Sequence, residues 1–144
     1  MSTLVRLWTS PARLLWWEWG KILGATALAG LVVALAMGYV PSPAVMAAVL
    51  HLAADFTFQS AETSARKGER GWHLVVHSLV AGGLPLALSG LLAGHLAAVL
   101  PWTAAGAAIH FAVDWTRKFG LRSLPLAVGL DQACHLAVIL ALTL

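Results

Sequence analysis

Charge is scarce in this chain of 144 residues, because Asp, Glu, Lys and Arg together make up only 10% of it. Soluble domains usually carry about 25% charged residues. Hydrophobic residues reach 60%, and the mean hydropathy is +0.82. A water-soluble fold of this size could not bury so much apolar surface. The composition therefore predicts an integral membrane protein, and the length allows one domain.

Cysteine is also nearly absent, since Cys134 is the only one. A single cysteine excludes an intrachain disulfide and argues against a Cys-rich structural zinc site. No convincing small-residue cleavage site follows the first apolar run, which argues against a secretory signal peptide. The net charge of +3 does not call for nucleic acid as a partner, because membrane topology explains where the basic residues lie.

Long apolar runs, by contrast, are plentiful. A bilayer core of about 30 Å needs about 20 apolar residues per helix. Five segments qualify, at about 21–40, 44–60, 72–100, 102–119 and 124–144. The third contains Gly82, Gly83 and Pro85, where we expect a kink or a tilted helix. The predicted fold class is an all-α bundle of five transmembrane helices, with residues 21–144 as a single membrane domain.

The basic residues predict how this bundle is oriented. Three of the nine Lys and Arg precede the first segment, three lie between the second and third, and three lie between the fourth and fifth. The two Pro-marked connections hold none. With five spans all nine fall on one side, which the positive-inside rule assigns to the cytoplasm. We therefore expect a multi-pass protein of the cytoplasmic membrane with its N-terminus inside.

Tryptophan gathers in residues 1–20, which hold four of the seven Trp, at Trp8, Trp16, Trp17 and Trp19. Trp and basic residues together are typical of the membrane–water interface. This stretch is therefore predicted to be an interfacial segment that contacts the lipid bilayer. The alternative is that the Trp-rich N-terminus docks on a larger membrane-protein complex.

Four pairs of ionisable residues lie four residues apart in this apolar sequence. They are His51 and Asp55, His73 and His77, His110 and Asp114, and Asp131 and His135. Residues at this spacing project from one face of a helix. An ionisable group inside a bilayer is costly unless it is paired or hydrated, so such groups face the bundle interior. With the predicted orientation, all four pairs lie in the cytoplasmic half and are expected to converge on one site.

Imidazole and carboxylate groups on facing helices are the ligands that metal sites in helix bundles use, and they suit Zn, Fe or Mn. The predicted metal ligands are His51, Asp55, His110, Asp114, Asp131 and His135. Because the candidates exceed one tetrahedral shell, either two metals bind or some of these residues orient the ligands. A third interpretation is that the pairs only bond helices together.

Polar neighbours extend the predicted site. Gln59 lies one turn beyond Asp55, and Arg117 and Lys118 continue the stripe of His110 and Asp114. The two basic residues could attract an anion such as phosphate. Gln132 is turned by about 100° from Asp131 on a helix, so it is expected to bond another helix.

These motifs resemble a bacterial family of small integral-membrane proteins, catalogued as domain-of-unknown-function family 3307. The resemblance covers about Ala44 to the C-terminus, with Lys67 and Lys118 as plausible counterparts of lysines in the family. It implies the fold more than an activity. The H-x3-D style is also distantly similar to predicted membrane-bound metal-dependent hydrolases. The matching residues are His51-Leu-Ala-Ala-Asp55-Phe-Thr-Phe-Gln59, His77, His110-Phe-Ala-Val-Asp114 and Asp131-Gln132-Ala-Cys-His135.

The leading functional hypothesis is a membrane-embedded, metal-dependent hydrolase of a phosphoester or lipid-linked substrate. A divalent metal would activate water and polarise the scissile group. His77, Asp55 or Asp114 would act as general base, and Arg117, Lys118 and Gln59 would hold the substrate anion. Two alternatives are a non-catalytic subunit of a larger membrane complex and a metal-ion or proton transporter. Transport needs a continuous polar route, and the outer half offers little beyond His95.

Overall fold

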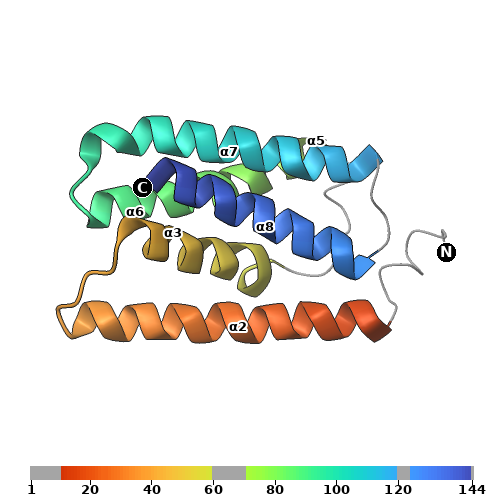
Figure 1. Cartoon of the computed structure of the whole chain (residues 1–144), viewed down its shortest axis with the longest axis horizontal. Helices are drawn as coiled ribbons and strands as arrows, with labels where there is room; N and C mark the ends of the chain where they lie inside the picture. Colours follow the sequence, from red (N-terminus) through yellow and green to blue (C-terminus); the bar gives the residue numbers. More distant parts are fainter. Residues whose placement is uncertain (1–10, 60–70, 120–123, 144) are drawn as a thin grey trace.

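The computed structural model describes the backbone of residues 11–59, 71–119 and 124–143, and the side chains of these residues except 11–16, 116–119, 124–128, 130 and 131. This part of the chain is helical throughout, with turns and no strand, which confirms the all-α prediction. Five helical rods correspond to the five predicted segments (Figure 1). They are α2 (Pro11–Ala36), α3 (Pro43–Leu52) continued by the π-helical η1 (Ala53–Thr57), the rod of α5 (Gly71–His77), η2 (Ser78–Gly83) and α6 (Leu84–Leu92), then α7 (Leu96–Phe119) and α8 (Leu124–Thr143).

The first rod begins earlier than predicted. Helix α2 starts at Pro11, so half of the segment predicted to be interfacial is part of the first helix. Proline suits the first turn of a helix, because its missing N–H has no partner to lose there. The helix ends at Ala36, and Gly38, with φ 79°, is the left-handed residue of the Schellman motif that follows. The N–H groups of Gly38 and Tyr39 close the motif by donating to Leu35 and Ala34.

The predicted boundary between the third and fourth rods is wrong. Pro101 does not separate them but lies inside α7, one turn after its start. The chain turns at Gly94, which has φ 78° and ends α6 in a second Schellman motif, with His95 N–H donating to Gly90 O at 2.7 Å. A glycine that adopts a left-handed conformation therefore ends the helix, while the proline is accommodated near the helix start.

The irregularity predicted for the third rod takes the form of a π-helical segment. η2 spans Ser78–Gly83, and α6 follows with Pro85 in its first turn. Gly82 contacts Gly106 of α7 so closely that a Cβ at Gly82 would lie 2.7 Å from the Gly106 carbonyl oxygen and 2.4 Å from Cβ of His110. Small residues permit this approach of two helices, and it brings His110 toward the bundle centre.

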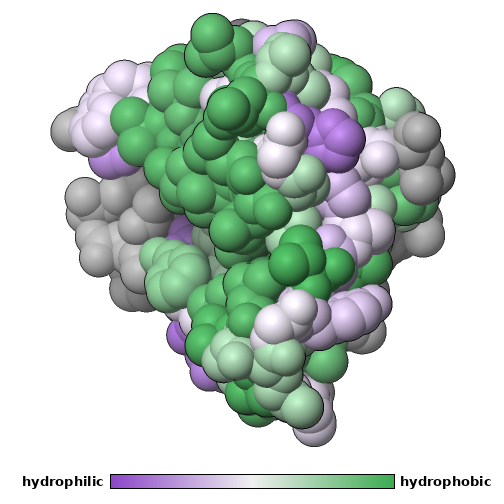
Figure 2. All heavy atoms as spheres, turned by 90° about the vertical axis from the view of Figure 1, so that its left-hand side faces the viewer, coloured by the Kyte–Doolittle hydropathy of each residue, from purple (hydrophilic) through white to green (hydrophobic). Residues whose placement is uncertain are grey.

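Three helices are long and apolar enough to cross a membrane: Trp17–Ala36, Gly71–Leu92 and Leu96–Trp115. They indicate a membrane protein. Two further apolar helices, Pro43–Thr57 and Gln132–Thr143, are shorter within the described residues. Figure 2 shows that the end of the bundle with the α6–α7 turn is largely hydrophobic. Leu96 and Leu100 are among its exposed residues, at 69% and 79%.

Helix α2 lies at one edge of the bundle, against α3 and η1, while α7 packs along η2 and α6 (Figure 1). Helix α8 contacts both α3 and α7. A small apolar core of Ala47, Leu86 and Ile139 joins the α3, α6 and α8 helices. His51, His110 and His135 line a cavity with Leu86 and Ile139 of this core.

Candidate metal centre

Two π-helical segments position the first polar residues of the site. His51 is near the end of α3 and Asp55 lies in η1, while His77 is the last residue of α5, directly before η2. π-helical turns are rare and occur frequently at functional sites. His51 Nδ1–H donates to the carbonyl oxygen of Ala81 in η2 at 2.8 Å. A side chain of the site thereby joins α3 to the π-helical segment η2.

Four atoms from three rods converge on one buried point. His77 Nε2 lies 2.8 Å from His110 Nε2, 3.2 Å from Asp55 Oδ1 and 3.4 Å from Asp114 Oδ2. His110 Nε2 lies 3.6 Å from the same Asp114 oxygen. All four side chains are at least nine-tenths buried. We call Asp55, His77, His110 and Asp114 the four-ligand cluster.

These four distances are close to those between the ligand atoms of a metal site. Ligand atoms 2.0–2.1 Å from a tetrahedral ion stand about 3.3 Å apart, and the four distances above lie on either side of that value. A neutral imidazole has one N–H, which cannot serve three acceptors around His77 Nε2 at once. Asp55, His77 and His110 form one group able to hold a metal ion, and His110, Asp114 and His135 form another.

Two glutamines fix the ligands from outside. The Gln59 amide lies 3.1 Å from His77 Nδ1, and the Gln132 amide N–H donates to Asp55 Oδ2 at 2.6 Å. Hydrogen bonds of this kind orient metal-ligating histidines and carboxylates. Gln59 was predicted to hold a substrate anion, but the structure places it, buried, on His77. The prediction that Gln132 bonds another helix is confirmed.

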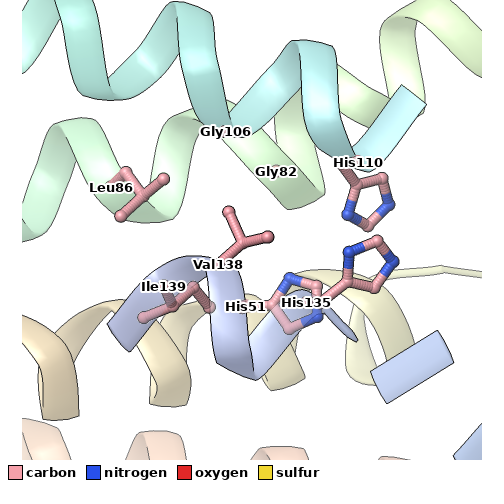
Figure 3. Close-up of a pocket in the computed structure, with 8 residues that line it drawn as sticks. All are labelled: His51, Gly82, Leu86, Gly106, His110, His135, Val138 and Ile139. Atoms are coloured by element: carbon pink, nitrogen blue, oxygen red, sulfur yellow. The ribbon is translucent and has the colours of Figure 1, made fainter. Parts of the chain in front are cut away.

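Three histidines face a small cavity next to the four-ligand cluster. His51, His110 and His135 line one side of it, and apolar residues of η2, α6, α7 and α8 line the rest (Figure 3). The cavity measures about 10 Å³, which is near the room that one water molecule needs. The His110 and His135 rings are stacked, with centroids 3.9 Å apart.

The structure thus brings together seven of the predicted site residues, named at the end of this paragraph. His73 is not among them, because it stacks on Trp72 instead of joining His77. His95 lies in the exposed α6–α7 turn. The side chains of Asp131, Arg117 and Lys118 lie outside the described residues. The seven are His51, Asp55, Gln59, His77, His110, Asp114 and His135.

Sequence reasoning missed one member of this arrangement, the carbonyl of Ala81. Backbone acceptors carry no residue-type signal, so only the helix packing identifies it. The nearest sequence signal was the pair Gly82 and Gly83, which marked η2 as irregular.

The fold and this cluster define a class: an all-helical protein with helices of membrane-spanning length and a buried His/Asp group able to hold a metal ion. Residues 45–144 match the family model described as Protein of unknown function (DUF3307), and the chain belongs to that family. No curated protein and no solved structure gives a significant match. The match confirms the resemblance seen in the motifs. Helix α2 precedes the matched region.

Proposed function

We propose that this protein binds a divalent cation, Zn, Fe or Mn, at the four-ligand cluster and hydrolyses a phosphoester, carried by a lipid or by a smaller molecule. The observation that carries the proposal is that the buried Nε2 atoms of His77 and His110 lie 2.8 Å apart, each with a carboxylate oxygen of Asp55 or Asp114 within 3.6 Å. Two His and two carboxylates suit these metals. Without a cation, burying these four ionisable groups would lower the stability of the fold, because each group loses its contact with water.

The same proposal includes a topology of five spans with the N-terminus and the site toward the cytoplasm. It is supported by the order of the chain, because η1 and α7, which carry Asp55 and Asp114, lead into residues 60–70 and 120–123. These connections hold four of the nine basic residues, and Arg117 and Lys118 lie just before the second of them. Lys and Arg in short connections mark the cytoplasmic side. A phosphorylated substrate would then approach from the cytoplasm, past Arg117 and Lys118.

Each residue of the cluster has a distinct task in this scheme. A bound cation would supply Lewis-acid polarisation of the phosphoryl group and lower the cost of deprotonating water. Asp55 and His77 each have both polar atoms engaged, with Gln132 and Gln59 holding the outer ones. Asp55, His77 and Asp114 are the candidates for the general base. Arg117 and Lys118 would hold the substrate anion.

Passage of an ion through the bundle is less well supported. Beyond His51 and His135 the cavity ends at Leu86, Val138 and Ile139. Leu86 and Ile139 belong to the buried apolar core with Ala47. An apolar floor of this kind closes the polar site on one side, which suits a one-sided reaction site.

The first test is metal content. The full chain is purified in mild detergent, loaded with Zn²⁺, dialysed and measured by elemental mass spectrometry. We expect stoichiometric metal in the wild type and in His95→Asn, a control histidine far from the cluster. His77→Asn and Asp114→Asn should lose most of it. A wild type that stays folded but takes up no Zn²⁺, Fe²⁺ or Mn²⁺ would refute the metal centre.

Hydrolysis is tested on the metal-loaded protein with p-nitrophenyl phosphate and with phosphatidate in mixed micelles. Phosphate release that depends on added metal and disappears in Asp114→Asn supports the enzyme. Metal binding without release from either substrate would contradict the hydrolase assignment. Recovery of the chain in a stable larger assembly would then favour the accessory-subunit alternative.

A further inference from the structure

We propose that the site holds a second cation, bound by His51 and His135 and bridged to the first by Asp114. The inference rests on the proposed function, because it places a second ion beside the four-ligand cluster. It adds a specific chemistry: two adjacent divalent ions favour in-line displacement at phosphorus. The substrate class thereby narrows to phosphate esters.

The ring geometry separates the histidines into two pairs. Two imidazoles that bind one tetrahedral ion at 2.0–2.1 Å have ring centroids about 5 Å apart. His77 and His110, which share the first centre, are 4.8 Å apart with a tilt of 58°. His51 and His135 repeat this relation, at 5.0 Å and 57°.

The remaining ring contacts show why one ion cannot serve all four histidines. His110 and His135 are stacked at 3.9 Å with an interplanar angle of 14°. A metal binds in the plane of an imidazole, so the nearly parallel rings of His110 and His135 are less well placed to share an ion than the tilted pairs, although their ligand atoms lie within 4.8 Å of each other. His51 and His110 are 5.5 Å apart, but Nε2 of His110 already belongs to the first centre.

His51 has the orientation of a metal ligand. Its Nδ1–H donates to Ala81 O at 2.8 Å, so in the neutral ring the lone pair is on Nε2. Such a bond to a backbone carbonyl is the usual support of a ligating histidine. His51 and His135 are only 1% and 4% exposed. Both rings border the cavity of about 10 Å³, which can hold a water molecule as a further ligand (Figure 3).

Asp114 is close to both histidines of the first pair and to His135 of the second. Its Oδ2 lies 3.4 Å from His77 Nε2 in the four-ligand cluster. Asp114, His110 and His135 also offer ligand atoms that lie within 4.8 Å of one another. A carboxylate in this place can bridge two ions, and two-metal sites hold their ions about 3.5–4 Å apart.

The experiment counts ions per chain. The full-length protein in mild detergent is loaded with Zn²⁺, dialysed, and analysed for metal and protein on the same sample. We expect two ions in the wild type and one in His51→Asn and in His135→Asn. The matched controls Cys134→Ser, next to His135 but exposed, and His95→Asn should keep two. Circular dichroism and size-exclusion chromatography verify that each variant is folded.

The outcomes distinguish the two proposals. One ion in the wild type, lost in His77→Asn and retained in His135→Asn, overturns the second site and leaves the proposed function intact. No ion in the wild type overturns both. Two ions that persist in His51→Asn and His135→Asn overturn the assignment of these ligands. The number of ions in the wild type decides whether a second ion binds, even if a histidine variant fails to fold.

Discussion

The side-chain amide of Gln59 decides which ring nitrogen of His77 carries the proton. If the carbonyl of Gln59 faces Nδ1, the ring donates from Nδ1 and keeps a lone pair on Nε2 for a cation. If the NH₂ group faces Nδ1, which is the arrangement in the structure, the ring accepts at Nδ1 and carries its proton on Nε2, 3.2 Å from Asp55 Oδ1. The two arrangements differ only by rotation of the amide, which exchanges its oxygen and nitrogen. Gln59 can therefore support a proton-bound and a metal-bound form of the cluster.

Substitutions of Gln59 test whether this residue orients His77 as a metal ligand without binding the metal itself. We expect Gln59→Leu to weaken Zn²⁺ affinity about 10–100-fold, the usual cost of losing an outer partner of a ligand. Gln59→Glu should retain or raise the affinity, because its carboxylate accepts the Nδ1–H proton. Competition titration against a chelator of known affinity measures both. Equal loss of affinity in the two variants would contradict the positioning role.

At the scale of elements, the glycines of α2 position η1, which carries Asp55. A Cβ at Gly24 would lie 2.5 Å from Thr57 Oγ1 and 2.9 Å from the Leu52 carbonyl oxygen. A Cβ at Gly20, one turn earlier, would lie 2.3 Å from the Phe56 ring. Thr57 Oγ1–H donates to the Lys21 carbonyl at 3.3 Å. A helix outside the family region thus supports an element of the site.

Gly24→Ala tests this contact, with Gly30→Ala as a control on the same helix. The new methyl group at Gly24 meets backbone and should destabilise the fold by about 1–3 kcal/mol. Gly30 has nothing within 4 Å, so alanine there should be neutral or stabilise the helix by about 0.5–1 kcal/mol. Thermal unfolding in detergent compares their Tm values. A Gly24→Ala Tm at or above that of Gly30→Ala would show that α2 does not press on η1.

On the scale of the whole molecule, the two ends of the bundle differ in charge and in exposed apolar side chains. The end with the α6–α7 turn is hydrophobic and holds no Lys or Arg (Figure 2). The basic connections follow α3 and α7 in the chain. This asymmetry predicts that the two ends of the bundle face different compartments.

Cysteine labelling in a Cys134→Ser background tests this orientation. Ser42→Cys in the α2–α3 connection and His95→Cys in the α6–α7 turn should react with an impermeant maleimide added to intact cells. Ser64→Cys, in the basic connection, should react only after the cells are opened. The reverse pattern would place the N-terminus and the metal centre on the outer side.

The sequence by itself determined the helical class, the membrane character and most of the residues that meet, although His73 stacks on Trp72 and the side chain of Asp131 lies outside the described residues. Apolar length and the spacing of His51 with Asp55 or His110 with Asp114 are local properties, so they survive without knowledge of the packing. Helix ends were less predictable. Gly94 rather than Pro101 ends a helix, because what matters is the backbone conformation that the turn requires.

Only the tertiary structure decided how the polar residues are paired. Three contacts of the site form between helices. They are the stacking of His110 on His135, the hydrogen bond from His51 to Ala81 and the hydrogen bond between Gln59 and His77. The helix spacing and rotation that create them depend on the contact of Gly82 with Gly106 and on the π-helical segments. These are properties of packing, which a periodic pattern along one helix does not contain.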